Sequence, residues 1–578
     1  MNSVGQPLQQ RPINRRLLTA AIVGLLIFIG FNWVPSWYQS VSDEPSGAVI
    51  SRDTAAERAS AFAEARLGYT PAPGDTWSVL YESDSKFYGY LSRKNLTERY
   101  MDRNLDEKYP YDYYRATLIP SGADDESVAV FLNMYTGDVV GFNHTLQRTD
   151  SEAANRQTLA SKSDTLSEPQ MRELAEPWLK LWGANLDNLT YSAGSDLVVT
   201  DKSVAVGEAS LQYRFGFERE QVNALTTRFT VPQWHTDYMD SQKRTATLLT
   251  MVGYGLPTLI LGILALIYSI LRRHHTSFKR GLFLSLFYFA VMMSTTYNVY
   301  ASPEQALNDS RVTNIILFVV YTLYSLLMSV LLYFSLVGGD GLWRKEGVNA
   351  WPRAREQGYG RYVLDSVYTG YLWAFVLLGV QTLIFIVLQN VLGSWYTTDA
   401  SQSTYNMKYA WLLPLTAWLA GLSEEALYRF FGIRMLSKVV RSTVLASLIT
   451  TLVWAFGHTL YPIYPVSSRP IELTVIGLLF SFIFLRYGFI AVMFSHVIFD
   501  SILMGSSLIF MKDAVNIGSG IVSMILPLIV GYLVYRFNPP GRERTVRLWD
   551  SPAPELGPIG GAPAGENGGR GEGPDTIR

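Results

Sequence analysis

The chain has 578 residues, of which 48% are hydrophobic and only 17% are charged, and its formal net charge is -1. So low a share of charged side chains is unusual for a soluble protein of this length and indicates a membrane protein with an additional soluble part. The near-neutral charge gives no reason to expect nucleic acid as a partner. Because the sequence contains no cysteine, disulfide bonds, cysteine-ligated zinc, iron–sulfur clusters and a thiol nucleophile are excluded.

The N-terminal segment predicts a membrane anchor. Residues 1–16 carry several arginines and no acidic residue, and residues 17–34 then form an uncharged apolar run. No small-residue cleavage pattern follows this run, so we interpret it as a transmembrane anchor rather than a signal peptide. The positive-inside rule places residues 1–16 in the cytoplasm.

Residues 35–245 are polar and predict an α+β domain. Thr54 and Ser167 each begin a capping-box pattern, in which Glu or Gln follows three residues later, so each predicts the start of a helix. Residues 128–142 predict a β-hairpin around a Thr-Gly-Asp turn. Two successive helix-then-strand units suggest a duplication, and their pattern resembles the small PepSY-type modules found outside bacterial membranes. We expect a globular sensor or docking domain, which could select substrates or regulate access.

The C-terminal half predicts a polytopic membrane bundle. About nine further apolar segments approach the ~20 residues that a transmembrane helix needs. Their ranges are 247–271, 281–300, 314–337, 366–393, 411–436, 442–461, 471–486, 489–510 and 516–536. The predicted fold class is an all-α polytopic membrane helix bundle with an N-terminal anchor helix and an α+β extracytoplasmic domain inserted after that anchor. Residues 246–365 would form helices that precede the core, and residues 366–537 would form the core.

The basic loops predict the orientation of the bundle. Clusters of Lys and Arg lie in residues 272–280, 343–361, 434–441 and 542–547. If the N-terminus is cytoplasmic, every one of these clusters falls on the cytoplasmic side, and residues 35–245 fall outside. Residues 538–578 are rich in Gly and Pro and should form a disordered cytoplasmic tail. We therefore expect a multi-pass protein of a bacterial inner (plasma) membrane, with both termini cytoplasmic.

Ionisable side chains gather in three of the predicted spans. They are Glu424 and Glu425, then His458, then His496 and Asp500. A carboxylate at the bilayer centre costs about 2.5–3.5 kcal/mol even on lenient insertion scales. A chain tolerates such residues where they pair or where chemistry happens, so we expect the three helices to build one polar site.

Spacing predicts the partners within this group. Glu425 and Arg429 are four residues apart, so they share a helix face and can form an ion pair. Glu424 points about 100° away from Glu425 on a helix and needs another partner, such as a histidine or a catalytic water. His496 and Asp500 also share a face. A structural ion pair and a neutral His–Asp hydrogen bond are the alternatives to a catalytic role.

The residue types in this group favour hydrolysis. There is no nucleophile elbow for a serine hydrolase and no His-Glu-x-x-His helix. Glutamate and histidine can activate water by general base catalysis, and histidine can stabilise an oxyanion. Alternatively, Glu424, His458, His496 and Asp500 could bind a divalent metal such as zinc. Both routes lead most naturally to cleavage of a peptide bond.

Three motifs in this region resemble those of a known family. They are Glu424-Glu425-x-x-x-Arg429, Trp454-x-x-x-His458 and His496-x-x-x-Asp500. In this order they resemble the successive motifs of the CAAX-protease and bacteriocin-processing family, which are intramembrane endopeptidases of the type II CAAX prenyl protease kind. The resemblance covers roughly residues 365–540.

The resemblance implies a role for each residue. Glu424 would be the general base that activates water, with His458 as its partner. His496 and Asp500 would form the oxyanion site. The remaining residues would support the site: Glu425 and Arg429 would hold the first helix in place, and Trp454 would form an aromatic wall.

Two positions depart from the family pattern. Trp454 stands where Phe is common, which keeps an aromatic wall. Asp500 stands where Asn is common, and an ionised carboxylate would repel an oxyanion, so Asp500 must be protonated, point away or serve another role. A carboxylate here also favours the metal alternative. Metal-dependent and glutamate-based mechanisms both stay open at this point.

The predicted function is an intramembrane endopeptidase acting on membrane-associated protein or peptide substrates at the lipid bilayer. One alternative is a non-catalytic membrane scaffold or immunity-type protein that keeps the fold. Another is a proton-coupled transporter, in which acids and histidines relay protons. Transporters often contain paired inverted repeats, and residues 246–540 show no such pattern. The sequence indicates neither the substrate nor the oligomeric state.

Overall fold

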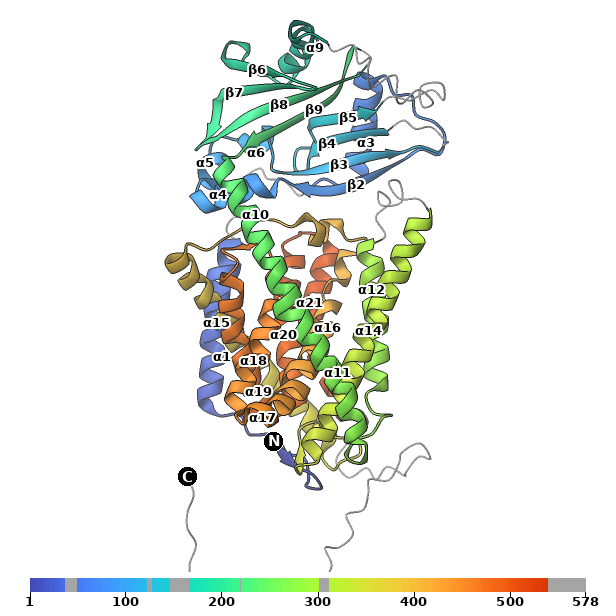
Figure 1. The fold of residues 1–578 in the computed structure, drawn as a ribbon, viewed down its shortest axis with the longest axis vertical. Helices are drawn as coiled ribbons and strands as arrows, with labels where there is room; N and C mark the ends of the chain where they lie inside the picture. The colour runs from blue at the N-terminus through green and yellow to red at the C-terminus, as the bar shows by residue number, and fades with distance from the viewer. Residues whose placement is uncertain (37–48, 122–126, 146–165, 219, 301–310, 539–578) are drawn as a thin grey trace, which may run out of the picture. The chain divides into compact units, whose positions relative to one another are not determined.

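A computed structural model describes residues 1–36, 49–121, 127–145, 166–218, 220–300 and 311–538 (Figure 1). The residues up to 541 form one compact unit. It contains a large β-sheet with covering helices and a bundle of long apolar helices. The predicted disordered tail, residues 538–578, lies almost entirely outside the described residues.

The sheet belongs to the predicted α+β domain. Its strands are β2 (Thr76–Ser83), β3 (Asp112–Ile119), β4 (Ser127–Asn133), β5 (Val139–Thr145), β6 (Leu189–Ala193), β7 (Leu197–Val206), β8 (Ala209–Glu218) and β9 (Gln221–Thr230). They form one antiparallel sheet in the order β2-β3-β4-β5-β9-β8-β7-β6. The predicted hairpin is present as β4 and β5. Each half begins with a helix, α3 or α9, and contains four strands, and the last strands of the two halves pair. In the first half, three further helices in residues 85–108 lie between β2 and β3. Whether the halves arose by duplication stays a prediction.

Of the two helix starts predicted in this domain, the one at Ser167 is confirmed and the one at Thr54 is wrong. Helix α9 (Glu168–Leu181) begins with the predicted capping box of Ser167 and Gln170. Helix α3 (Arg52–Phe62) begins earlier than predicted, because Ser51 caps it by accepting the Thr54 amide hydrogen. The prediction of Thr54 as the cap was wrong, since Ser51 offers the same hydroxyl one turn earlier.

The bundle contains α1 (Arg15–Phe28), α10 (Gln233–Leu248), η4 (Leu249–Gly255), α11 (Leu256–Leu271), α12 (Leu282–Tyr300), α14 (Arg311–Arg344), α15 (Tyr359–Leu392), α16 (Leu415–Glu424), η9 (Glu425–Ile433), α17 (Arg434–Val440), α18 (Thr443–Phe456), α19 (Ser468–Tyr487), α20 (Phe489–Ile509) and α21 (Ala514–Phe537). In the described part of the chain, 7 helical segments are long and apolar enough to cross a membrane, and α12 and α18 contain shorter apolar helices. Every predicted span contains a helix, while the number that cross the bilayer stays a prediction.

Two predicted helix boundaries were wrong. The span predicted at 411–436 becomes a regular α-helix only at Leu415, after Pro414, whose ring lacks an N–H and favours a helix start. From Glu425 to Ile433 its turns are π-helical, a geometry that often occurs at functional sites. The span predicted at 442–461 ends at Phe456, so the residues that follow belong to a turn.

Glycines allow several of these helices to approach closely. A Cβ at Gly24 of α1 would lie 2.4 Å from the Phe375 carbonyl oxygen of α15. A Cβ at Gly421 of α16 would lie 3.0 Å from the Met493 carbonyl oxygen of α20. Small residues at such contacts are typical of membrane helix packing. The contact at Gly421 brings the end of α16, which carries the two adjacent glutamates, against α20.

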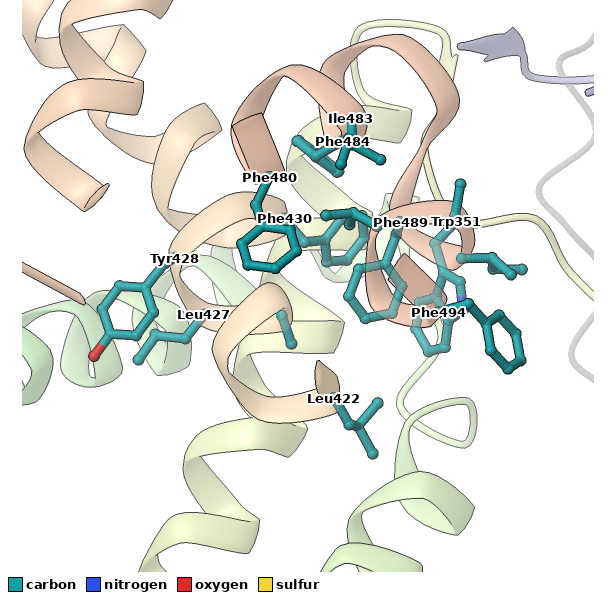
Figure 2. Close-up of a cluster of buried hydrophobic side chains, with 14 of the residues drawn as sticks. Trp351, Leu422, Leu427, Tyr428, Phe430, Phe480, Ile483, Phe484, Phe489 and Phe494 are labelled. Carbon is teal, nitrogen blue, oxygen red and sulfur yellow. The ribbon is translucent and has the colours of Figure 1, made fainter. Parts of the chain in front are cut away.

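An aromatic cluster packs around Phe430 of the π-helical segment (Figure 2). The Phe430 ring lies 5.0 Å from the Phe489 ring and 6.2 Å from the Phe484 ring. The Trp351 ring lies 6.0 Å from Phe430, and its other neighbour is Phe489 at 5.9 Å. Aromatic pairs at these distances add about 0.5–1.5 kcal/mol each beyond their buried area. The cluster thus holds the segment that also carries Glu425 and Arg429.

Candidate active site

Three helices and one turn deliver the predicted residues to a common site. The end of α16 and the start of η9 supply Glu424 and Glu425, and α20 supplies His496 and Asp500. His496 lies at the centre, because carboxylates from both neighbouring helical segments lie within 4 Å of its two nitrogens. The structure therefore brings together side chains that are far apart in the sequence.

Glu425 and Arg429 form a fully buried ion pair. Arg429 Nη1 lies 3.0 Å from Glu425 Oε1, and both side chains are 0% exposed. The Arg429 guanidinium also lies 4.4 Å from the centre of the Trp454 ring, within reach of a cation–π interaction. Breaking such a pair leaves an uncompensated buried charge. The spacing-based prediction of this pair agrees with the observed geometry.

The same Glu425 oxygen fixes the orientation of His496. His496 Nδ1 lies 2.8 Å from Glu425 Oε1, so an ionised Glu425 accepts the Nδ1 hydrogen. The ring is stacked on Phe480, with centroids 4.5 Å apart and planes at 22°. With one nitrogen and one face occupied, His496 presents Nε2 to the rest of the site.

Asp500 faces this free nitrogen. Asp500 Oδ2 lies 3.4 Å from His496 Nε2, and its side chain is 17% exposed. Glu424 Oε2 lies 3.9 Å from the same nitrogen. Asp500 therefore does not project into open space as a separate oxyanion donor, because its carboxylate is directed at His496.

Glu424 differs from its neighbour by being accessible. Its side chain retains 24% exposure, whereas Glu425 has none. The indole Nε1 of Trp454 donates a hydrogen bond to Glu424 Oε2. Trp454 thus does more than provide the aromatic wall that the sequence predicted, since it also holds one oxygen of Glu424 and leaves the other available.

His458 lies in the turn after α18. Its Nδ1 is 3.0 Å from the Trp454 carbonyl oxygen, which can only accept, so Nδ1 carries the hydrogen and Nε2 is left free. Its ring centre lies 5.1 Å from that of Trp454. Among the described residues, no hydrogen bond joins His458 to Glu424. Both predicted partners contact Trp454, Glu424 at the indole N–H and His458 at the ring, so a water or a substrate could connect them.

A second group of buried charges lies next to the site and was not predicted from the sequence. Glu472 of α19 is 0% exposed and pairs with Arg469 Nη1 at 2.7 Å. Gln381 of α15 donates to its other oxygen at 2.9 Å. The Arg469 guanidinium also lies 5.0 Å from the centre of the Tyr461 ring, which in turn lies 5.7 Å from the His458 ring. The Arg-x-x-Glu spacing at the start of a predicted span was the available signal.

The residues present do not fit a metal centre. Within the described ranges, no group of three or more His, Asp or Glu side chains is arranged so that it could hold a metal ion. Glu424, His458, His496 and Asp500 are therefore not arranged as a preformed metal site in this structure.

The fold and this site define an integral membrane protein that buries a glutamate–histidine cluster suited to hydrolysis. Residues 406–502 match the family model described as type II CAAX prenyl endopeptidase Rce1-like. The matched range contains every predicted site residue, and the match confirms the resemblance predicted from the three motifs. Because this is a family of proteases, the match supports a hydrolase. No curated protein and no solved structure matches the chain.

Proposed function

We propose that the chain is an intramembrane endopeptidase that hydrolyses peptide bonds of membrane-associated protein or peptide substrates. The observation that carries this proposal is the contrast between the two adjacent glutamates. Glu425 is completely buried, and its carboxylate pairs with Arg429 and His496. Glu424 stays accessible beside the same histidine. A general base must reach both water and substrate, so Glu424 is the carboxylate suited to that role.

The proposed reaction is a direct attack by water. Glu424 takes a proton from water as the oxygen forms a bond with the scissile carbonyl carbon. The Nε2 atom of His458, whose ring also contacts Trp454, helps to hold this water. The proton on Glu424 then passes to the leaving amine nitrogen as the carbon–nitrogen bond breaks, which restores the carboxylate.

In the proposed reaction, His496 stabilises the oxyanion that forms on the scissile carbonyl. Glu425 fixes its ring, and its Nε2 faces the position between Glu424 and Asp500. A hydrogen on this nitrogen can be donated to the developing oxyanion. Because Nδ1 already donates to Glu425, His496 carries a hydrogen on both nitrogens in this role. Asp500, 3.4 Å from Nε2, accepts the second hydrogen until the oxyanion takes it.

The orientation and the domain layout are part of the proposal. Exposed apolar side chains on the outer helices, such as Phe283 at 76% and Val391 at 73%, suit contact with lipid. We place residues 1–16 and 538–578 in the cytoplasm and residues 35–245 outside, with the anchor at 17–34 and the membrane helices at 246–365 and 366–537. The outside domain would select substrates or control their access.

The test is a comparison of membrane proteomes from cells that produce the wild type or Glu424→Gln. Glutamine keeps an oxygen for the Trp454 N–H but cannot take a proton, so fragments of membrane proteins should appear only with the wild type. Glu176→Gln, on the surface of α9 and paired with Lys180, is the matched control and should cleave normally. Fragments that persist at wild-type levels with Glu424→Gln would contradict the proposal and favour a scaffold.

A further inference from the structure

The turn that carries His458 depends on neighbouring segments for its position. It lies between Phe456, which ends α18, and Ser468, which begins α19. The His458 amide still donates to the Ala455 carbonyl oxygen at 3.1 Å, but residues 462–467, which follow, lie in neither helix. A catalytic side chain must be held closely, because a misplacement of ~1 Å can cost on the order of 100-fold in rate. Whatever holds this turn therefore determines how well His458 can serve the site.

One side of the turn rests on the long helix that enters the bundle. Thr459 Oγ1 donates to the Ala246 carbonyl oxygen at 3.0 Å and lies 2.9 Å from Thr250 Oγ1. Further along, the Val466 amide donates to Gln242 Oε1 at 2.8 Å. These contacts fix the turn against α10 and η4.

The other side of the turn is held by a short ribbon. Strand β11 (Trp395–Tyr396) pairs with β12 (Ile463–Tyr464), and the Thr397 amide donates to the Pro462 carbonyl oxygen at 2.9 Å. The Trp395 and Tyr464 rings are stacked, with centroids 4.6 Å apart and planes at 22°. Residues 395–397 therefore support the segment that follows His458 through both backbone and side-chain contacts.

The same residues are attached to the sheet domain on their far side. Thr397 Oγ1 donates to the Ser85 carbonyl oxygen at 2.5 Å. A Cβ added at Gly89 of α4 (Ser85–Lys94) would lie 2.8 Å from Cζ3 of Trp395. The Trp395 ring centre also lies 5.6 Å from that of His235, whose Nε2 contacts the Lys86 carbonyl oxygen at 3.1 Å. Trp395 is thus packed directly onto α4.

We propose that Trp395 and Thr397 are positioning residues through which the sheet domain sets the place of His458. This inference rests on the proposed function, and it adds a part of the chain that lies outside the matched range 406–502. The continuous contacts run from α4 to the ribbon and from the ribbon to the turn. The sheet domain is then a component of the active site as well as a substrate-selecting module.

The most specific test is a substitution within the sheet domain that leaves the ribbon and the turn unchanged in sequence. Gly89→Ala places a methyl group against the Trp395 ring, so the ribbon must shift. Gly194→Ala is the matched control, because its added Cβ would meet only the Asp196 carbonyl oxygen, at 3.9 Å. Trp395→Ala removes the stack from the ribbon side, and Trp395→Phe should restore it. Thr397→Val removes only the side-chain hydrogen bond to Ser85. It replaces the other variants in the test if they prevent folding.

Two measurements on purified full-length protein in lipid nanodiscs separate the possible outcomes. The first is the nuclear magnetic resonance signal of His458, which can be assigned by His458→Gln because the chain has 6 histidines. The second is cleavage of a substrate found by the proteome comparison. Gly89→Ala and Trp395→Ala should shift the His458 signal and lower kcat by about 10- to 100-fold with little change in KM. Gly194→Ala and Trp395→Phe should resemble the wild type.

An unmoved His458 signal in folded Gly89→Ala, Trp395→Ala and Thr397→Val would overturn the inference, as would an unchanged kcat. A shifted signal in a protein whose wild type cleaves nothing would leave the positioning intact and contradict the proposed function instead. The two claims can therefore fail independently.

Discussion

The carboxylates of Glu424 and Glu425 have opposite environments although the residues are adjacent. Glu425 is 0% exposed and shares one oxygen between Arg429 and His496, while Glu424 is 24% exposed and is held by the Trp454 indole. The structure thus distinguishes a carboxylate that is fully buried and paired from one that stays accessible. This distinction leads to separate predictions for stability and for cleavage.

Replacing one member of the buried pair should destabilise the protein strongly. Glu425→Ala or Arg429→Ala leaves an uncompensated charge in the bundle, which costs about 3–5 kcal/mol. Glu424→Gln, which keeps its hydrogen-bond acceptor at an accessible position, should change stability little. Thermal unfolding of the purified variants in one detergent measures the difference. Equal unfolding temperatures for all three variants would contradict the assigned roles.

Gly477 of α19 should be intolerant of any side chain. A Cβ there would lie 2.6 Å from Thr451 Cγ2 and 2.9 Å from Arg429 Nη2. Gly477→Ala should therefore push the guanidinium away from Glu425 and cost about 1–3 kcal/mol, as overpacking commonly does. Gly518→Ala is the control, because nothing lies within 4 Å of its added Cβ. A Gly477→Ala protein as stable as the Gly518→Ala protein would show that the cluster is less tightly packed.

The proposed orientation predicts which residues are accessible from outside the cell. Because the chain contains no cysteine, single cysteines can be introduced without background labelling. Ser192→Cys in the sheet domain should react with a membrane-impermeant maleimide on intact cells. Lys345→Cys, in a basic loop, should react only after the membrane is permeabilised. The reverse pattern would invert the orientation.

Asp500→Asn should retain cleavage to within about tenfold of the wild type. The amide oxygen can still accept a hydrogen from His496 Nε2, and the amide nitrogen can donate to an oxyanion. Asp500→Leu should lose cleavage, because His496 then loses its orienting acceptor. Initial rates at saturating substrate test this pair. Loss of cleavage in Asp500→Asn would indicate that the charge of Asp500, rather than its acceptor, is required.

The sequence predicted the parts of this site that depend on local spacing. The pairing of Glu425 with Arg429 follows from a separation of four residues on a helix. The membrane bundle follows from hydropathy, and the family follows from three motifs in order. These features need no knowledge of how distant helices pack.

Features that depend on packing between elements were not predictable. The bond from Trp454 to Glu424 and the approach of His496 to Glu425 depend on the crossing of three helices. The π-helical turns after Glu425 and the early end of α18 also lack a local signature. Arg469 and Glu472 were visible as a spaced pair, but their place beside His458 required the fold.

The contacts that connect the sheet domain to the turn of His458 are the clearest example of a feature that the sequence could not predict. Trp395 lies between two predicted spans and belongs to no recognised motif. The sequence therefore indicated only that it lies in a loop. The ribbon that contains it joins segments far apart in the chain, since Thr397 bonds to Ser85 across a separation of 312 residues. Such long-range contacts require the tertiary structure.

The most direct test of the central claim is the cleavage rate of purified Glu424→Gln in proteoliposomes, measured on a substrate identified from the proteome comparison. We predict a loss of at least about 100-fold, the lower end of what general base catalysis contributes, in a protein that unfolds at the wild-type temperature. A Glu424→Gln enzyme that cleaves at the wild-type rate would contradict the assignment of Glu424 as the general base.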